Sequence, residues 1–131
     1  MCVFCKIVEG IIPSYKIYED DMLIAILDIS QTTMGHTLVI PKKHYDNILD
    51  APDDVLMHLS IVVRDLAKKI TKNLNAKGVN ILNNTNEVAG QTVNHLHVHV
   101  IPRYSKDDSI KIEMHNNDFN LQDIFDKICQ K

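Results

Sequence analysis

The stretch His95-Leu96-His97-Val98-His99-Val100-Ile101-Pro102 decides the fold, because three histidines alternate in it with aliphatic residues. Side chains point alternately to the two faces of a strand, so a strand would gather the histidines on one face and turn the aliphatic residues into a core. A helix would scatter the histidines around its circumference, so the period favours a strand. A row of imidazoles adds little to the stability of a core, so the row indicates a functional site. A purely metal-binding row and a solvent-exposed polar edge are the alternatives.

The composition is that of one small domain with a core of its own. The chain has 131 residues, of which 45% are hydrophobic, and a net charge of −3. Its first residues lack the basic and apolar regions of a signal peptide, and no apolar run reaches the ~18 residues of a membrane span. We therefore expect a cytoplasmic protein. The absence of any Lys or Arg block argues against nucleic-acid and membrane partners.

Working outward from the histidines, the hydrophobic pattern predicts an α+β domain with a largely antiparallel five-stranded sheet. One long amphipathic helix begins within 50–54 and ends at 75–78, and a shorter helix covers 4–9. The apolar stripe Leu121, Ile124, Phe125 and Ile128 predicts a terminal helix, which packs either on its own domain or on another subunit. The expected strands cover 15–19, 22–28, 36–40, 79–82 and 93–101, with a short possible strand at 110–113.

The histidine run has the form His-φ-His-φ-His-φ-φ, where φ is hydrophobic, and it resembles the signature of the histidine triad (HIT) family. The segments 28–30, 35–44 and 89–94 are also similar to that family, with the spacing between blocks preserved. The likeness extends from about Phe4 to Tyr104. It implies one HIT domain over 1–131, with residues 105–131 as a tail that no motif covers.

The resemblance implies nucleotidyl hydrolysis or transfer. Members of the family bind a purine nucleotide and attack its α-phosphate with the middle histidine, forming a covalent nucleotidyl-histidine that water hydrolyses. Carried over, His97 is the nucleophile and the carbonyl of His95 accepts the proton of its other ring nitrogen. His99 would hold a phosphate oxygen or help the leaving group. A neutral imidazole with one nitrogen fixed in this way is a good nucleophile near neutral pH.

The same resemblance implies contacts for the rest of the nucleotide. Asp28 takes the ribose hydroxyls, because its two acceptor oxygens suit a vicinal diol, and His36 helps to order the triad. A turn cap is the alternative for Asp28, and simple core packing is the alternative for Phe4 and Ile26. The remaining positions are Gln91 and Thr92 for the phosphate or the leaving group, Gly90 and Asn84 beside the phosphate, Ile29 against the nucleoside, and Phe4, Ile7 and Ile26 as walls for the base.

The N-terminal Cys2-x-x-Cys5 has the spacing of zinc ligands. With an odd number of cysteines in a reducing compartment, this pair indicates a metal or redox motif rather than a disulfide framework. A zinc-bearing branch of the family, and the related galactose-phosphate uridylyltransferases, resemble the full pattern. They imply a closed, structural Zn²⁺ site made by Cys2, Cys5, His44 and His95. The alternative is a frayed Cys2 and a Cys5 that packs in the core.

Three functions compete. The first is a hydrolase that cleaves nucleoside phosphoramidates or adenylyl conjugates at the α-phosphate. The second is a dinucleoside polyphosphate hydrolase, and the third is a nucleotide-binding interaction protein with vestigial activity. The intact histidines and Gln91 rank the third lowest. The family resemblance also implies a two-fold homodimer.

Overall fold

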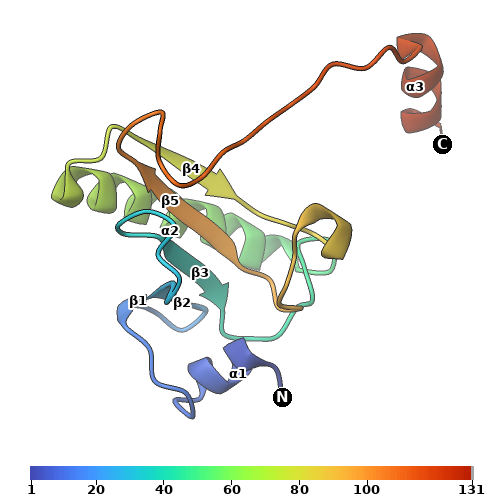
Figure 1. Cartoon of the computed structure of the whole chain (residues 1–131). Helices are drawn as coiled ribbons and strands as arrows, with labels where there is room; N and C mark the ends of the chain where they lie inside the picture. The colour runs from blue at the N-terminus through green and yellow to red at the C-terminus, as the bar shows by residue number, and fades with distance from the viewer. Residues whose placement is uncertain (131) are drawn as a thin grey trace.

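A computed structural model describes residues 1–130, and Lys131, the last residue of the predicted tail, lies outside them. Five strands form one antiparallel sheet in the order β1-β2-β3-β5-β4 (Figure 1). The predicted α+β class with a five-stranded antiparallel sheet is therefore confirmed. The elements in chain order are α1 (Val3–Val8), β1 (Lys16–Glu19), β2 (Leu23–Leu27), β3 (Thr37–Pro41), α2 (Asp53–Leu74), β4 (Gly78–Leu82), the 3₁₀ helix η1 (Glu87–Ala89), β5 (Val98–Arg103) and α3 (Leu121–Ile128).

The long helix α2 covers one face of the sheet, where it packs over β3, β5 and β4. Its buried residues recur at helical spacing and include Val55, Leu59 and Val62. The helix ends at Asn75, whose φ of 55° lies in the left-handed region that asparagine tolerates. The predicted long helix is thus confirmed, and it makes the larger of two cores.

The other face of the sheet carries a smaller core beneath α1. Phe4 packs there with alternate residues of the central strands, among them Ile24 and Ile26 of β2. Because Leu23 and Ala25 face α2, the whole run from Leu23 to Ile26 is buried. This agrees with the continuous apolar pattern of a strand covered on both faces.

The histidine segment differs from the prediction, because it begins as a loop and not as a strand. β5 starts at Val98 rather than at 93, so only His99 of the three histidines lies in it. The backbone upstream makes other bonds: the Leu96 N–H donates to the carbonyl of Tyr45 at 2.7 Å, and the His97 carbonyl accepts from the side chain of Asn83 at 2.9 Å. Loop partners therefore replace the strand partner over 93–97.

The alternation of faces survives this change. Leu96, Val98 and Val100 are all buried in the core beneath α2, as the period predicted. Two strands include a proline at or next to their last residue, Pro41 at the end of β3 and Pro102 in β5. A proline near a strand end lacks only the N–H donor, so its carbonyl can still accept a hydrogen bond.

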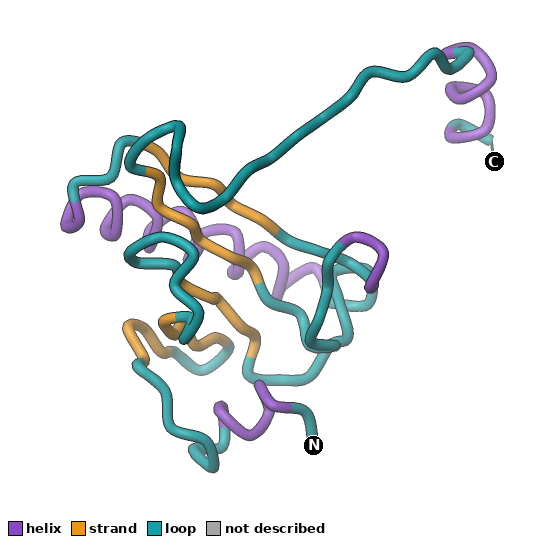
Figure 2. Tube along the Cα trace, viewed as in Figure 1, coloured by secondary structure: helices purple, strands orange, loops and turns teal. Residues whose placement is uncertain are grey.

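The segment after β5 leaves the body of the protein as an extended arm that carries α3 at its far end (Figure 2). The possible strand at 110–113 does not form, since these residues have no strand partner. The terminal helix does form, but every residue from 111 to 130 is exposed, so packing on its own domain, one of the two alternatives, is not observed. Among residues 1–130, no helix is long and apolar enough to cross a membrane.

Candidate active site and metal centre

His97 lies at the centre of the site, and its ring has a fixed tautomer. Its Nδ1 is 2.7 Å from the carbonyl oxygen of His95, which can only accept, so Nδ1 carries the hydrogen and Nε2 carries the lone pair. The ring is buried and packs edge-on against Phe4 and His99, with ring centroids 4.9 and 5.1 Å away. Burial lowers the pKa of His97 below its ordinary value. The neutral ring therefore presents a nucleophilic nitrogen.

His99 continues the site on the side of β3. Its Nδ1 lies 2.9 Å from Nε2 of His36, and that Nε2 lies 3.6 Å from Oδ2 of Asp28. The backbone N–H of Thr32 donates to Nδ1 of His36 at 3.4 Å, so Nε2 of His36 carries the hydrogen and donates it to His99. His99 then carries its own hydrogen on Nε2, where it is available as a donor.

Burial keeps this second pair of imidazoles neutral. It lowers the pKa of His99 from 6.5 to about 4, with the neighbouring His97 and His36 adding to the shift. It also lowers the pKa of His36. Near pH 7 the site thus combines a lone pair on His97 with a neutral N–H donor on His99. The lone pair suits nucleophilic attack, and the N–H donor suits stabilisation of a leaving group.

A cluster of two thiols and two imidazoles lies at the other end of the histidine segment. It joins Cys2 and Cys5 of the N-terminus to His44 and His95, and its ligand atoms lie within 4.8 Å of one another. The six pairwise distances between these atoms run from 3.0 to 3.6 Å. A tetrahedron with corners ~2.0–2.3 Å from its centre has edges of ~3.3–3.8 Å, so the four groups fit a closed zinc site.

The tautomers of the two imidazoles also fit a metal. Nε2 of His95 donates to the carbonyl of Pro41 at 2.8 Å, and Nε2 of His44 donates to the carboxylate of Asp46 at 2.8 Å. Each ring therefore turns the lone pair of Nδ1 toward the thiols, as a metal ligand must. With both of its ring nitrogens engaged, His95 offers the chemistry at His97 its main-chain carbonyl only.

Gln91, predicted to contact the phosphate or leaving group, is buried and fully bonded to the backbone. Its Nε2 donates to the carbonyls of Asp46 and Val93 at 2.7 and 3.0 Å, and its Oε1 accepts from the N–H of Asn86 at 2.8 Å. In this structure the side chain holds the loop before the triad against the loop that carries His44. Its role toward the phosphate or the leaving group stays a prediction.

The other predicted nucleotide contacts fall into two groups by exposure. Asp28 is part-buried, and its Oδ1 also accepts the N–H of Ser30, so it makes the turn predicted as its alternative role while facing His36. Phe4 and Ile26 are at most 7% exposed and belong to the core, which is the alternative to a contact with the base. Ile7 is half-buried. The exposed or half-buried remainder is Ile29, Asn84, Gly90 and Thr92.

Gly90 is the position where the backbone needs glycine. Its φ of +101° is strained for a residue with a side chain, and an added Cβ would lie 3.2 Å from Nδ2 of Asn84. The Asn84 amide in turn bonds the Gly90 carbonyl at 3.4 Å. The loop is therefore shaped by two of the residues predicted beside the phosphate.

Asp46 and the carbonyl of Pro41 are two parts of the site that sequence reasoning missed. Asp46 follows the predicted ligand His44 by two residues, and a carboxylate so near a metal-binding histidine is a usual outer partner. That spacing was the available signal. No residue pattern indicates which carbonyl a buried imidazole will meet, so Pro41 could not have been found.

Comparison with known proteins agrees with this geometry. The family model described as HIT domain matches residues 9–106. Protein hit of Bacillus subtilis is 45% identical over 125 residues, which are 94% of this chain and 86% of that protein. Adenylylsulfatase HINT3 of Arabidopsis thaliana is 41% identical over 81% of this chain and 54% of its own length. Adenosine 5'-monophosphoramidase hnt1 of Schizosaccharomyces pombe is 40% identical over 78% and 74%.

Solved structures give the same result. A crystal structure of a HIT family member from Bacillus subtilis has a TM-score of 0.93 at 43% identity and covers 99% of this chain and 96% of that one. A zinc-bound histidine triad family protein from Mycobacterium smegmatis has a TM-score of 0.77 at 44% identity over 81% and 77%. The triad geometry, the matched domain and these relatives together show that the chain belongs to the HIT family.

Proposed function

We propose that this protein is a nucleotide hydrolase that cleaves purine nucleotides at the α-phosphate when the leaving group is small, as in nucleoside phosphoramidates and adenylyl conjugates. The observation that carries the proposal is the 2.7 Å bond from Nδ1 of His97 to the carbonyl of His95. This bond leaves Nε2 as the lone-pair nitrogen of a buried, neutral ring. The activities named for the Arabidopsis and fission-yeast relatives, on adenylyl sulfate and on an adenosine phosphoramidate, support this substrate class.

The reaction has two steps. Nε2 of His97 attacks the α-phosphorus, a P–N bond to the ring forms, and the bond from phosphorus to the leaving group breaks. His99 donates its Nε2 hydrogen toward the departing group. Water then attacks the same phosphorus and gives a proton to Nε2 of His99, the P–N bond breaks, and the nucleoside monophosphate leaves with His97 and His99 both restored.

The nucleotide would lie along the exposed side of this row. Asp28 takes the ribose hydroxyls with the oxygen that faces His36, and His36 holds the tautomer of His99. The phosphate side is made by Asn84, Gly90 and Thr92, while Ile29, which is 98% exposed, is free to cover the nucleoside. Phe4, Ile7 and Ile26 support the base from beneath rather than as open walls, and Gln91 holds the loop from which it would contact the phosphate or the leaving group.

Zinc would be held by Cys2, Cys5, His44 and His95. Four protein ligands leave no open position, so the ion supplies structure and not Lewis-acid chemistry. The site ties α1 to the segment that precedes His97, and His95 contributes both a ligand nitrogen and the carbonyl that fixes His97. A reducing cytoplasm would keep the two thiols available for the metal.

We also propose a homodimer. Apolar side chains are exposed on the outer side of α2 and on β4, among them Met57, Ile61 and Ile81. Apolar surface of this kind is what a two-fold contact would cover.

Turnover of two substrates tests the proposed activity. We expect faster hydrolysis of an adenosine phosphoramidate than of a diadenosine polyphosphate, and a protein-bound adenylyl group on His97 in rapidly quenched reactions. Faster cleavage of the diadenosine compound would assign the second activity instead. Nucleotide binding without turnover of either compound would make the protein a binding module.

A further inference from the structure

The loop between β2 and β3, residues 28–36, carries the bond that sets the direction of the hydrogen between His36 and His99. The two ends of the loop meet where the N–H of Asp28 donates to the carbonyl of His36 at 3.0 Å. Between them, the N–H of Thr32 donates to Nδ1 of His36 at 3.4 Å. That length is close to the limit of a hydrogen bond, so a small outward shift of Thr32 would break it. The tautomers of the two rings therefore depend on how firmly this loop is held.

Gln31 spans the loop with its side-chain amide. Its Nε2 donates to the carbonyls of Asp28 and His36 at 2.6 and 2.8 Å, and its Oε1 accepts from the N–H of Gly35 at 2.7 Å. Carbonyls only accept and a backbone N–H only donates, so these partners fix which end of the amide faces which group. One amide thus joins the first residue of the loop to its last two.

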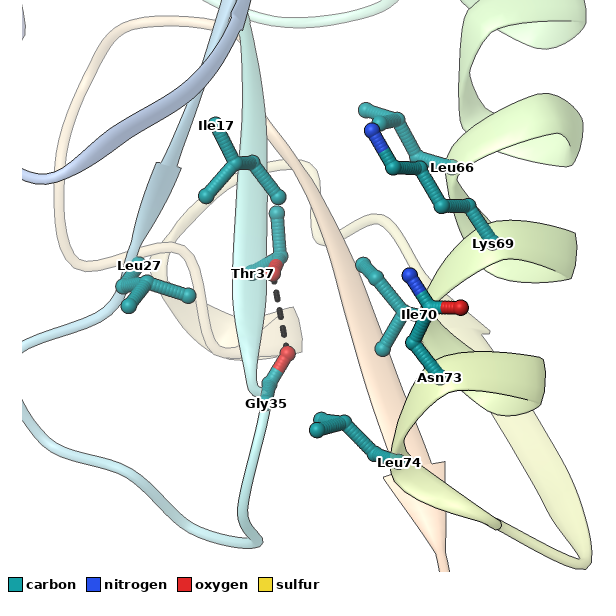
Figure 3. Close-up of a pocket in the computed structure, with 9 residues that line it drawn as sticks. All are labelled: Ile17, Leu27, Gly35, Thr37, Leu66, Lys69, Ile70, Asn73 and Leu74. Atoms are coloured by element: carbon teal, nitrogen blue, oxygen red, sulfur yellow. Dashed lines mark hydrogen bonds between the residues drawn. The ribbon is translucent and has the colours of Figure 1, made fainter.

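Gly35 is a firmly packed partner for this amide. Its φ of +95° lies in the left-handed region, and an added Cβ would lie 2.5 Å from Cδ1 of Leu74 at the end of α2. The hydroxyl of Thr37, the first residue of β3, donates to the Gly35 carbonyl at 2.9 Å (Figure 3). The bond from Gly35 to Oε1 therefore ties Gln31 to the sheet and to α2.

Gln31 controls the N–H of Thr32 because the two residues share a peptide group. The peptide bond is planar, so this N–H takes its direction from the carbonyl that belongs to Gln31. The next side-chain anchor of the loop comes after Thr32, where the hydroxyl of Thr33 donates to the carbonyl of Pro102 at 2.6 Å. The amide of Gln31 is the corresponding anchor before Thr32.

We propose that Gln31 is a positioning residue that keeps the donor hydrogen on Nε2 of His99. By holding the loop, it keeps the N–H of Thr32 on Nδ1 of His36, so that Nε2 of His36 donates to His99. The reverse arrangement makes the same bond between the rings but leaves Nε2 of His99 with a lone pair. The carboxylate of Asp28, 3.6 Å from Nε2 of His36, favours the first arrangement, and the same amide holds its backbone. The role of Gln31 in turnover rests on the proposed hydrolysis, whereas the tautomers can be measured without substrate.

The ring tautomers test this role directly. Gln31→Met keeps the length of the side chain and removes all three bonds, and because Gln31 is exposed the change removes no core packing. Long-range ¹H–¹⁵N spectra at pH 7, with ring signals assigned by His36→Asn and His99→Asn, distinguish a nitrogen that carries hydrogen from one with a lone pair. We expect a hydrogen on Nε2 of His99 in the wild type and a clear shift toward the reverse pair in the variant. Tyr104→Phe is the matched control, since it removes a 2.6 Å bond to the carbonyl of Met34 in the same loop and should leave both tautomers unchanged.

Two substrates separate this role from general support of the fold. An amine leaves phosphorus readily only with a proton, whereas sulfate leaves as the anion of a strong acid. We therefore expect Gln31→Met to lower kcat/KM for an adenosine phosphoramidate in proportion to the lost donor tautomer, by about five- to tenfold, and to lower kcat/KM for adenylyl sulfate by less than about twofold. The ratio kcat/KM is compared because it reports the steps up to departure of the leaving group.

Unchanged tautomers in Gln31→Met would overturn the proposal. The same shift in Tyr104→Phe would also overturn it, because the loop as a whole would then set the tautomer. An equal loss on both substrates would mean that Gln31 supports the fold rather than the donor. A wild type that cleaves neither substrate, but whose tautomers shift in Gln31→Met, would reject the proposed hydrolysis and leave the positioning role standing.

Discussion

His95 and His99 lie two residues on either side of His97, and each belongs to a cluster of possible metal ligands with polar atoms within 4.8 Å of one another. In the His95 cluster, both imidazoles give their Nε2 hydrogen to oxygens outside the cluster, on Pro41 and Asp46. Two lone pairs and two thiols are left facing a common centre. Such a centre suits a cation.

The His99 cluster, made by Asp28, His36 and His99, also contains two imidazoles at similar spacing, but it has a carboxylate in place of the thiols and the opposite polarity. The N–H of Thr32 occupies Nδ1 of His36, so the hydrogen of His36 points into the cluster, where His99 accepts it at 2.9 Å. A metal on Nε2 of His36 would have to displace that hydrogen and turn Nδ1–H against the N–H of Thr32. The cluster is satisfied as a hydrogen-bonded chain that ends in a donor on His99.

The difference between these clusters teaches that a close pair of imidazoles does not by itself define a metal site, because the outer partner of each imidazole decides which nitrogen faces inward. His44 has the carboxylate of Asp46 as its outer partner and turns a lone pair inward, whereas His36 has the N–H of Thr32 and turns a hydrogen inward. His97, between the two clusters, takes its tautomer from the main chain of the first and its neighbouring donor from the second.

Replacing His97 with Ala should have the largest effect, since it removes the proposed nucleophile, which lies between the two clusters. We expect kcat to fall by at least three orders of magnitude, about 4 kcal/mol of barrier, with nucleotide affinity nearly unchanged. Steady-state turnover of an adenosine phosphoramidate and equilibrium binding of AMP measure the two quantities. Retention of a tenth of the wild-type kcat would show that the covalent route is not used.

Changing Cys5 to Ser should break the His95 cluster alone. Wild-type protein purified without chelator should hold about one zinc per chain, and the variant much less, with a melting temperature lower by about 10 °C or more because metal binding contributes directly to folding. Elemental analysis and calorimetry give both values. Cys129→Ser is the matched control, because Cys129 is exposed at the end of α3. This variant should lose neither zinc nor stability.

His36→Asn sharpens the same comparison from the other side. This variant should keep its zinc, because His36 belongs to the hydrogen-bonded chain. A second zinc in the wild type that is lost with His36 would mean that the two clusters are both metal sites.

Alternation and helical spacing were sufficient to predict most of the fold. The run from Leu23 to Ile26 and the stripe of α2 predicted their own burial, because an apolar pattern reports which faces a chain can cover. The strand predicted over 93–101 was started five residues too early, since β5 begins at Val98. Its polar backbone is bonded by Tyr45 and Asn83, which are distant or turn-forming residues that a local pattern does not connect.

For the site, residue types identified the groups but not their bonds. The resemblance placed Cys2 and His44 together, and the structure brings them within 3.6 Å. The same resemblance assigned Gln91 to the phosphate, whereas its amide is bonded to backbone on both ends. A side chain's type limits what it can donate or accept, but the fold decides which partner it meets.

Low pH should act on the His99 cluster through His99 itself. Its pKa falls from 6.5 when unfolded to about 4 when folded, so between these values the unfolded chain binds more protons and the free energy of unfolding drops as the pH is lowered. The loss should reach about 3 kcal/mol near pH 4. Urea unfolding of wild type and His99→Asn at pH 7 and 4.5 isolates this contribution, since the other titrating groups are present in both proteins. Parallel pH profiles would mean that His99 is not held neutral by the fold.

Asp46→Asn should have the smallest effect and tests the outer partner directly. The amide keeps the shape and can still accept from Nε2 of His44, but without charge it makes His44 a poorer ligand, and loss of an outer partner typically weakens metal binding by about 10–100-fold. Competition with a chromophoric chelator measures the zinc affinity. Asp50→Asn is the control, because Asp50 is an exposed acid on the same loop that bonds the N–H groups of Asp46 and Asn47 and does not contact His44. If the two variants weakened zinc equally, the general negative charge of the loop would support the metal. A loss confined to Asp46→Asn would show that the hydrogen bond, by fixing which nitrogen of His44 faces the thiols, separates the metal cluster from its counterpart around His99.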